Sequence, residues 1–346
     1  MSIAKTNPNV RYGYLDCIKG LSILCITFLH FEKGVMPSWL NSWIGLFMIT
    51  TFYFTAGWVF GLKGKIDEPK VLFKKRIKQL GIPYLWFTAV ILCFEIIWWA
   101  LGMMESETIL RDIYKTITLR GIGTLWFLPV LFFGEYLFCR ILSSKRPILV
   151  GSIIFILMIV VSYLYYEIWL NRYLDKGVIY QLVDSPVRPF VSALCAWPII
   201  GAGYLVCRKF AQRLHDGNLW ISAILGTFLI LISIWFLINP PFQVFYVNGF
   251  VSNTLPVIGF IGVFALLSDT FVGKFFSYWG RNSLILMCTH FSITMEILMG
   301  FDSAVLHQES FEGISTIIYF VIAILLTYPI VMLFNGPLSF MLGKKK

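Results

Sequence analysis

Long apolar stretches alternate with short polar segments along almost the whole chain. Each stretch is close to the roughly 20 residues that a helix needs to cross a bilayer. We place ten such spans, at about 14–32, 42–62, 80–101, 124–142, 148–169, 190–208, 219–238, 250–268, 279–299 and 313–335. The pattern therefore predicts an all-α polytopic membrane protein with about ten transmembrane helices.

Composition agrees with this prediction. Of the 346 residues, 58% are hydrophobic and 13% are charged, whereas a soluble globular domain carries about 25% charged residues. The first twelve residues are polar, and the first apolar run lacks a small-residue cleavage site, so we expect the first span to remain as an anchor. We expect one integral-membrane domain over 1–346 and no soluble extracytoplasmic domain.

The net charge of +10 is better explained by the membrane than by nucleic acid, because the basic residues lie in short segments between spans. With the N-terminus in the cytoplasm, the cytoplasmic segments hold 20 Lys and Arg and the opposite side holds 7. This asymmetry predicts that both termini are cytoplasmic. The cysteines are scattered singly, without a CxxC or Cys/His cluster, so we expect no metal site and no disulfide framework.

Two ionisable residues, Lys19 and His30, lie within the first span, eleven residues apart. On a helix this spacing places them within about 20° of the same side, with a rise of about 16 Å. Ionisable groups at membrane depth are costly and usually face a bundle interior or a water-filled path. His30 is a candidate proton acceptor. Lys19 is either a helix-end partner of Asp16 or the receptor of an anionic ligand.

A basic run precedes the third span, and it contains Lys74, Lys75, Arg76 and Lys78. Orientation in the membrane explains such a run, and so does the binding of phosphate groups at the cytoplasmic face.

Two carboxylates, Glu95 and Glu135, fall within predicted spans. An unpaired carboxylate in an apolar environment is costly, so each needs a partner or a proton.

Further candidates lie beside apolar segments. Trp126 fits an interfacial aromatic belt as well as a site. His290 lies in the ninth span, and Ser283, seven residues earlier, lies close to the same helix face. Asn282 lies at the cytoplasmic entrance of that span. His290 is equally well explained as a packing residue with a hydrogen bond.

Four segments together resemble the membrane-bound acyltransferase-3 family of polysaccharide and lipopolysaccharide O-acetyltransferases. They are YLDCIKGLSILCITFLH at 14–30, FYFTAGWVF at 52–60, LWFLPVLF at 125–132 and WGRNSLILMCTH at 279–290. The family signature of Arg or Lys, ten residues and then His is met by Lys19 and His30. Its Arg-x-x-Arg signature is met imperfectly, by Arg76 with Gln79 or by Lys75 with Lys78. PYLWF at 83–87, with the LWFLPVLF segment and Glu135, looks closest to the fucose 4-O-acetylase-like branch.

The resemblance implies a multi-pass enzyme of the bacterial cytoplasmic (inner) membrane that uses acyl-CoA, most often acetyl-CoA, and no metal. The acyl group would pass to a sugar hydroxyl of a cell-envelope or exopolysaccharide glycan, or of a lipid-linked sugar. His30 would act as general base or carry the acyl group transiently. The cations expected at the CoA phosphates are Lys19, Lys74, Lys75, Arg76 and Lys78. Ser283, Asn282 or Trp126 would stabilise the oxyanion.

Two alternatives stay open at this point. In a proton-coupled secondary transporter, the ionisable residues within spans would form a relay; these are Lys19, His30, Glu95, Glu135 and His290. The absence of an internal sequence repeat argues against a carrier. The third class is a polytopic assembly partner without activity of its own.

Overall fold

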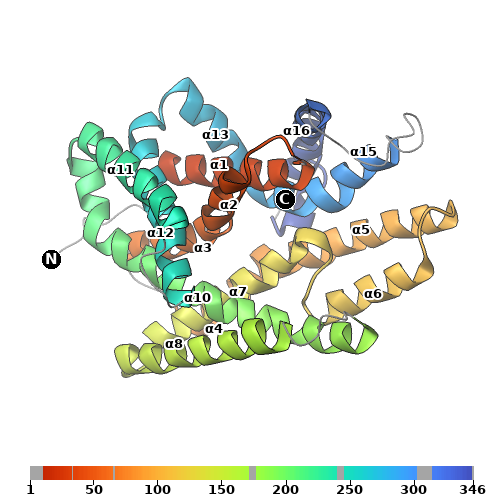
Figure 1. The fold of residues 1–346 in the computed structure, drawn as a ribbon, viewed down its shortest axis with the longest axis horizontal. Helices are drawn as coiled ribbons and strands as arrows, with labels where there is room; N and C mark the ends of the chain where they lie inside the picture. The colour runs from red at the N-terminus through yellow and green to blue at the C-terminus, as the bar shows by residue number, and fades with distance from the viewer. Residues whose placement is uncertain are drawn as a thin grey trace. The chain divides into compact units, whose positions relative to one another are not determined.

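The computed structural model describes residues 11–32, 34–64, 67–170, 177–239, 245–301 and 314–344. These ranges are helical with short connections and contain no β-strand (Figure 1). Ten helical stretches of the described chain are long and apolar enough to cross a membrane, which confirms the predicted number of spans.

The helices include short π and 3₁₀ segments that join or end the α-helices. In chain order the α-helices are α1 (Gly13–Phe31), α2 (Ser38–Phe47), α3 (Thr50–Lys63), α4 (Pro69–Arg76), α5 (Ile82–Ala100), α6 (Ser106–Ile117), α7 (Phe127–Leu142), α8 (Pro147–Tyr163), α10 (Val178–Asp216), α11 (Leu219–Ile238), α12 (Phe245–Leu267), α13 (Phe271–Arg281), α14 (Ser283–Thr289), α15 (Glu296–Phe301) and α16 (Ile314–Asn335). The other segments are η1 (Ile77–Gly81), η2 (Gly123–Trp126), η3 (Leu164–Trp169), η4 (His290–Met295) and η6 (Ser339–Leu342).

Several helix boundaries differ from the predicted ones. The third span extends from Pro69 to Ala100, so the basic run lies on the same helical stretch as the apolar segment. The predicted ninth span, 279–299, crosses a break, because α13 ends at Arg281 and α14 begins at Ser283. The connecting segment 102–123 contains the amphipathic helix α6, which a search for long apolar runs does not detect. Residues 171–176, in another connecting segment, lie outside the described residues.

The chain forms two compact units. Unit 1 comprises Met1–Ile66, Ile199–Leu286 and Leu298–Leu325, and unit 2 comprises Asp67–Pro198, Met287–Ile297 and Leu326–Lys346. The helices α10 and α16 each contribute residues to both units. Each unit therefore combines segments that are far apart in the sequence.

In unit 1, helices α1 and α13 lie side by side and approach through glycines (Figure 1). A Cβ atom on Gly20 would lie 1.8 Å from the carbonyl oxygen of Phe276, and one on Gly280 would lie 1.8 Å from that of Asp16. Small residues permit such backbone approach between membrane helices, where packing replaces the hydrophobic effect as the driving force. The sequences LDCIKG and WGRN, about 260 residues apart, therefore meet directly.

A second glycine pair joins α3 to α10 within the same unit. A Cβ atom on Gly57 would lie 1.8 Å from the carbonyl oxygen of Ile200, and one on Gly203 would lie 2.0 Å from that of Phe54. The FYFTAGWVF segment is thus fixed by close helix packing.

In unit 2, η2 packs against the segment that contains η4. The Thr124 hydroxyl donates a hydrogen bond to the carbonyl oxygen of Met287, and a Cβ on Gly123 would lie 2.2 Å from the Ser292 hydroxyl oxygen. The Phe87 ring of α5 packs on Phe334 of α16, with ring centroids 4.8 Å apart. The LWF segment at 125–127 is therefore held near the end of the WGRNSLILMCTH segment.

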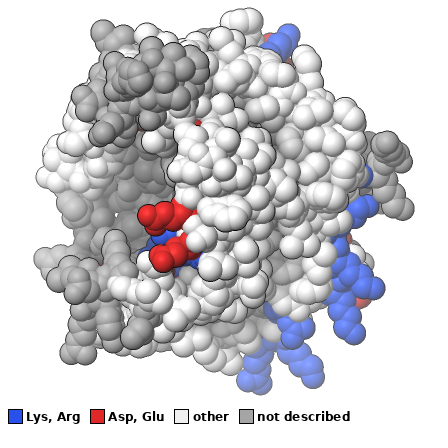
Figure 2. Space-filling model, turned by 90° about the vertical axis from the view of Figure 1, so that its right-hand side faces the viewer, with Lys and Arg blue, Asp and Glu red and all other residues white. Residues whose placement is uncertain are grey.

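Much of the visible described surface carries no charge (Figure 2). Most Lys and Arg side chains in this view gather at its right and lower margins, and a small group of acidic side chains lies near the centre. Many large hydrophobic side chains are exposed on α8 and α11, including Ile148, Ile156, Ile224 and Trp235. Such a surface is typical of helices that contact lipid.

We expect Gly280→Ala to destabilise the protein, because the added methyl group meets main-chain atoms of α1 that cannot move independently. Overpacking of this kind costs about 1–3 kcal/mol. Gly45→Ala in α2 is the matched control, since a Cβ there meets no atom within 4 Å. Thermal unfolding of the purified protein in detergent measures the effect, and equal midpoints for the two variants would contradict the close α1–α13 contact.

Candidate functional site

Lys19 and His30 lie on one uninterrupted α-helix, α1, whose sequence contains no proline. The helical spacing predicted from the sequence therefore applies to both residues. Both side chains are partly buried. The stripe of two ionisable residues on the first helix is thus a feature of unit 1.

The His30 imidazole is oriented by its own helix. Its Nδ1 atom lies 2.7 Å from the carbonyl oxygen of Ile26. A carbonyl oxygen only accepts hydrogen bonds, so this contact requires a proton on Nδ1. In the neutral ring the lone pair then belongs to Nε2, which is the nitrogen able to accept a proton.

Glu32 ends the helix that carries His30. Its carboxylate accepts hydrogen bonds from the backbone N–H groups of Val35 (2.8 Å) and Met36 (2.9 Å) and from the Asn41 side-chain amide (2.7 Å). These bonds, with that from Met36 the strongest, hold the pKa of Glu32 below its usual value. Glu32 therefore fixes the turn between α1 and α2.

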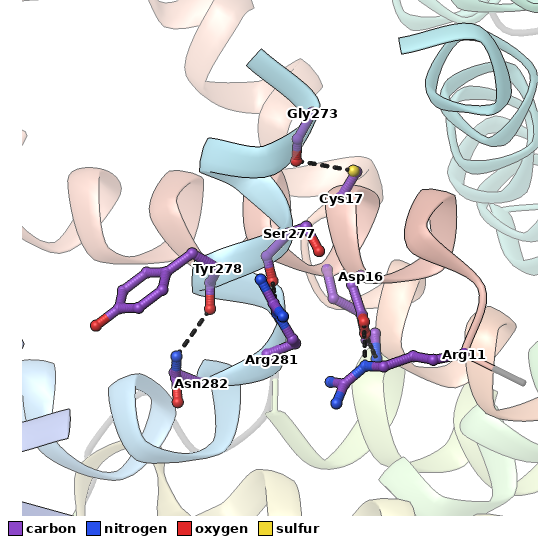
Figure 3. A network of polar contacts seen from close by, with 9 residues as sticks. Arg11, Asp16, Cys17, Gly273, Ser277, Tyr278, Arg281 and Asn282 are labelled. Atoms are coloured by element: carbon purple, nitrogen blue, oxygen red, sulfur yellow. Dashed lines mark hydrogen bonds and ion pairs between the residues drawn. The ribbon is translucent and has the colours of Figure 1, made fainter. Parts of the chain in front are cut away.

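Lys19 is an ion-pair partner of Asp16, as one of the two sequence interpretations predicts. The Lys19 Nζ atom lies 2.9 Å from Asp16 Oδ1. The Arg11 Nε atom lies 2.5 Å from Asp16 Oδ2, and Figure 3 shows Arg11 and Asp16 together. Asp16 is 4% exposed. Two cations thus share one buried carboxylate, and the cluster keeps a net positive charge.

Polar groups at the α1–α13 contact bond mainly to backbone carbonyls (Figure 3). The Cys17 thiol donates to the Gly273 carbonyl at 3.1 Å, and Arg281 Nε donates to that of Ser277 at 3.2 Å. The Asn282 amide donates to the Tyr278 carbonyl at 2.9 Å. Arg281 and Asn282 are thereby folded back onto their own helical segment.

The buried carboxylate of Glu135 has the partner that the sequence analysis requires. The Arg76 guanidinium forms an ion pair with it, and Arg76 Nη2 donates to Glu135 Oε1 at 2.8 Å. Arg76 Nη1 also donates to the Gln79 side chain at 2.6 Å. Since Glu135 is 1% exposed, Arg76 compensates a buried charge in unit 2.

The three lysines of the same basic run differ from Arg76, because all three are exposed. The Lys75 Nζ atom lies 3.6 Å from Asp67, a long surface ion pair, and the other two lysines are Lys74 and Lys78. Exposed pairs of this kind contribute about 0–1 kcal/mol. The lysines are therefore available to a ligand at little cost to the fold.

Trp126 and His290 belong to two packed segments of unit 2, η2 and η4. His290 is 1% exposed and begins the π-helical segment η4. Glu95 is also buried in unit 2, beside Asp112. Trp126 is partly exposed and lines a cavity.

The candidates of the sequence analysis thus divide between the units. Unit 1 holds Lys19, His30, Asn282 and Ser283, the last being the first residue of α14. Unit 2 holds the basic run, Glu95, Trp126, Glu135 and His290. Within the described ranges, no group of three or more His, Cys, Asp or Glu residues is arranged to hold a metal ion.

Sequence reasoning missed one polar network of unit 2, formed by Tyr165, Tyr180, Asp184 and Arg188. Tyr165 lies in the predicted span 148–169, and the other three residues lie between this span and the next. The spacing of Asp184 and Arg188, four residues apart, was the available signal.

Ten helical stretches that are long and apolar enough to cross a bilayer define a multi-pass membrane protein. The sequence of residues 12–336 matches the acyltransferase-domain family known as acyltransferase-3, and the chain belongs to that family. It is therefore a multi-pass membrane acyltransferase. Comparison with curated proteins and with solved structures gives no match.

The ion pair between Arg76 and Glu135 predicts an asymmetric response to mutation. Arg76→Ala leaves a buried carboxylate without its cation, which costs about 3–5 kcal/mol. Arg76→Met combined with Glu135→Leu removes both charges and should recover most of that loss. Lys75→Ala, at an exposed ion pair, is the control and should change stability by less than about 1 kcal/mol.

Thermal unfolding of the four proteins, wild type included, provides the measurement. If Arg76→Ala were as stable as Lys75→Ala, the pair would not compensate a buried charge.

Proposed function

We propose that this membrane acyltransferase moves an acyl group, most simply acetyl, from cytoplasmic acyl-CoA to a sugar hydroxyl. The acceptor is a glycan of the bacterial cell envelope, an exopolysaccharide or a lipid-linked sugar, and the fucose 4-O-acetylase-like branch is the part of the family that fits best. Membership of the family supports the reaction type. The observation that carries the proposed mechanism is the hydrogen bond from His30 Nδ1 to the Ile26 carbonyl oxygen.

His30 acts as the general base in this proposal. A hydroxyl group is a weak nucleophile until a base removes its proton as the new bond forms. With its proton on Nδ1, the neutral imidazole accepts the sugar proton at Nε2. A ring fixed by a main-chain carbonyl keeps one tautomer, as a base that must act repeatedly requires.

The proposed transfer is direct. The sugar oxygen attacks the thioester carbonyl carbon, a C–O bond forms, and His30 Nε2 takes the hydroxyl proton. The C–S bond then breaks, and the imidazolium returns the proton to the departing thiolate. The products are a sugar ester and free CoA, and His30 is neutral again.

The donor requires cations for its phosphate groups. Lys74, Lys75 and Lys78 are suited to this role because they are exposed and lightly paired. Lys19 is suited because Arg11 also neutralises Asp16, so that an anion near Lys19 meets net positive charge. Arg76 supports the run by its bond to Glu135 rather than by binding phosphate.

The direction of transfer follows from the distribution of charge. The excess of Lys and Arg in alternate connecting segments favours cytoplasmic termini. Lys19 then lies toward the cytoplasm and His30 about 16 Å further along the helix, toward the outside. The location that fits this arrangement is the bacterial cytoplasmic membrane.

His30→Gln should lower the rate of acyl transfer by a factor of about 10² to 10⁴, while leaving membrane insertion intact. Cys25→Ala, at another partly buried position of α1, is the control and should retain activity. The measurement is the intact mass of the envelope glycan from cells that produce each variant. If the His30→Gln glycan carried the wild-type number of acyl groups, His30 would not be the base.

Lys19→Ala should weaken acetyl-CoA binding about tenfold, as expected for one charge-assisted hydrogen bond to phosphate. Asp16 keeps Arg11 as a partner, so the fold should tolerate the change. Lys145→Ala, which removes an exposed cation elsewhere, is the control. Calorimetric titration of the purified variants with acetyl-CoA measures the affinity, and an unchanged value for Lys19→Ala would remove Lys19 from the donor site.

A further inference from the structure

Unit 2 contains a cavity of about 360 Å³ that the proposed transfer step leaves unassigned. Its polar and aromatic lining consists of Arg120, Trp126, Tyr166, Arg188 and Ser192, and the remainder is aliphatic. The volume is at the small end of the roughly 300–1,000 Å³ typical of ligand sites. A few polar groups among apolar and aromatic walls are the usual composition of such sites.

One of the two arginines, Arg188, is held in place by its neighbours. Its Nε atom donates to the Tyr165 hydroxyl at 2.7 Å and lies 3.2 Å from Asp184 Oδ2. Tyr165 in turn donates a hydrogen bond to Asp184, which is 7% exposed. Asp184 therefore balances one positive charge of this cavity.

The second arginine, Arg120, differs from Arg188. Within the described residues, no hydrogen bond or ion pair is formed by its guanidinium, which is partly buried. Burial and then the nearby Arg188 guanidinium lower the pKa of Arg120. Arg120 and Arg188 thus line one cavity, and within the described residues only Arg188 of the two forms an ion pair.

The backbone that carries Arg120 is strained. Leu119 adopts a left-handed conformation with φ of 61°, which is costly for a residue with a side chain. Gly121 follows with φ of 71°, and a Cβ there would lie 2.4 Å from the Trp126 backbone nitrogen. The turn therefore packs tightly against the backbone of Trp126, and Arg120 and Trp126 line the same cavity. Such strain persists where the surrounding structure holds it, often at ligand sites.

We propose that this cavity binds a sugar that carries an anionic group, a carboxylate or a phosphate, with Arg120 on the anion and Trp126 against the ring. Arg is suited to both anions because its planar fork matches their oxygens. An indole face packs against the apolar C–H face of a sugar, and Tyr166 and Ser192 supply hydroxyl groups for hydrogen bonds. This inference deepens the proposed function, on which it rests for the role of the sugar as acyl acceptor.

The test uses the full-length protein in nanodiscs of phosphatidylcholine, and it measures binding rather than acyl transfer. The probes are methyl glucuronide and glucose 6-phosphate as anionic sugars and methyl glucoside as the neutral one, each titrated by saturation-transfer NMR. We expect at least one anionic probe to bind about tenfold more tightly than methyl glucoside, a gain typical of a charge-assisted contact.

Arg120→Gln should abolish this preference, and Arg120→Lys should retain part of it. Arg111→Gln is the matched control, since it removes an exposed cation with only a 3.8 Å contact to Asp112 and should keep the preference. Trp126→Leu should weaken the binding of anionic and neutral probes alike. Equal thermal unfolding midpoints would show that the variants are folded.

Three results would overturn the proposal. They are equal or absent binding of the anionic probes, a preference that survives in Arg120→Gln, and loss of sugar binding when phosphatidylglycerol is added to the nanodisc. The last would assign the cavity to a lipid headgroup. Anionic sugar binding without any acyl transfer would keep this site while refuting the proposed function, so the two failures are distinguishable.

Discussion

The close approach of α1 and α13 at Gly20 and Gly280 is the contact on which unit 1 depends. Each glycine leaves room only for the main chain of the opposite helix. In a bilayer the hydrophobic effect gives no preference for helix–helix over helix–lipid contact, so packing of this closeness must supply the specificity. It places Asp16, and with it Lys19, beside the WGRN segment. The proposed donor cation is therefore positioned by two residues that have no side chain.

Charge compensation separates the structural cations from those available to a ligand. Asp16 and Glu135 are both buried, and each is bound by at least one cation. The Arg76 guanidinium is bound to Glu135, whereas the lysines of the same run are exposed. Arg11 and Lys19 share one carboxylate and keep positive charge. Arg188 and Tyr165 both bond to Asp184, whereas Arg120 forms no ion pair within the described ranges. An uncompensated cation in a partly buried position is where an anionic ligand gains most.

The segments that carry the family resemblance are contact segments between helices. LDCIKG meets WGRN in unit 1, and the residues around LWF meet those around His290 in unit 2. In His30, the Nδ1 atom bonds to a carbonyl oxygen of its own helix, so that the neutral ring carries its lone pair on Nε2.

The sequence by itself determined the ten spans, the placement of Lys19 and His30 on one helix, and the need of Glu135 for a partner. These follow from local periodicity and from the cost of charge in lipid, which act within single segments. Only the tertiary structure decided that the partner is Arg76, that α13 breaks from α14 at Asn282, and that Arg120 and Arg188 face one cavity with Trp126. Arg76 and Glu135 are 59 positions apart, and the hydropathy pattern contains no information on such a pairing. The packing of the helices therefore determines which residues pair, whereas the sequence alone shows only that a buried charge needs a partner.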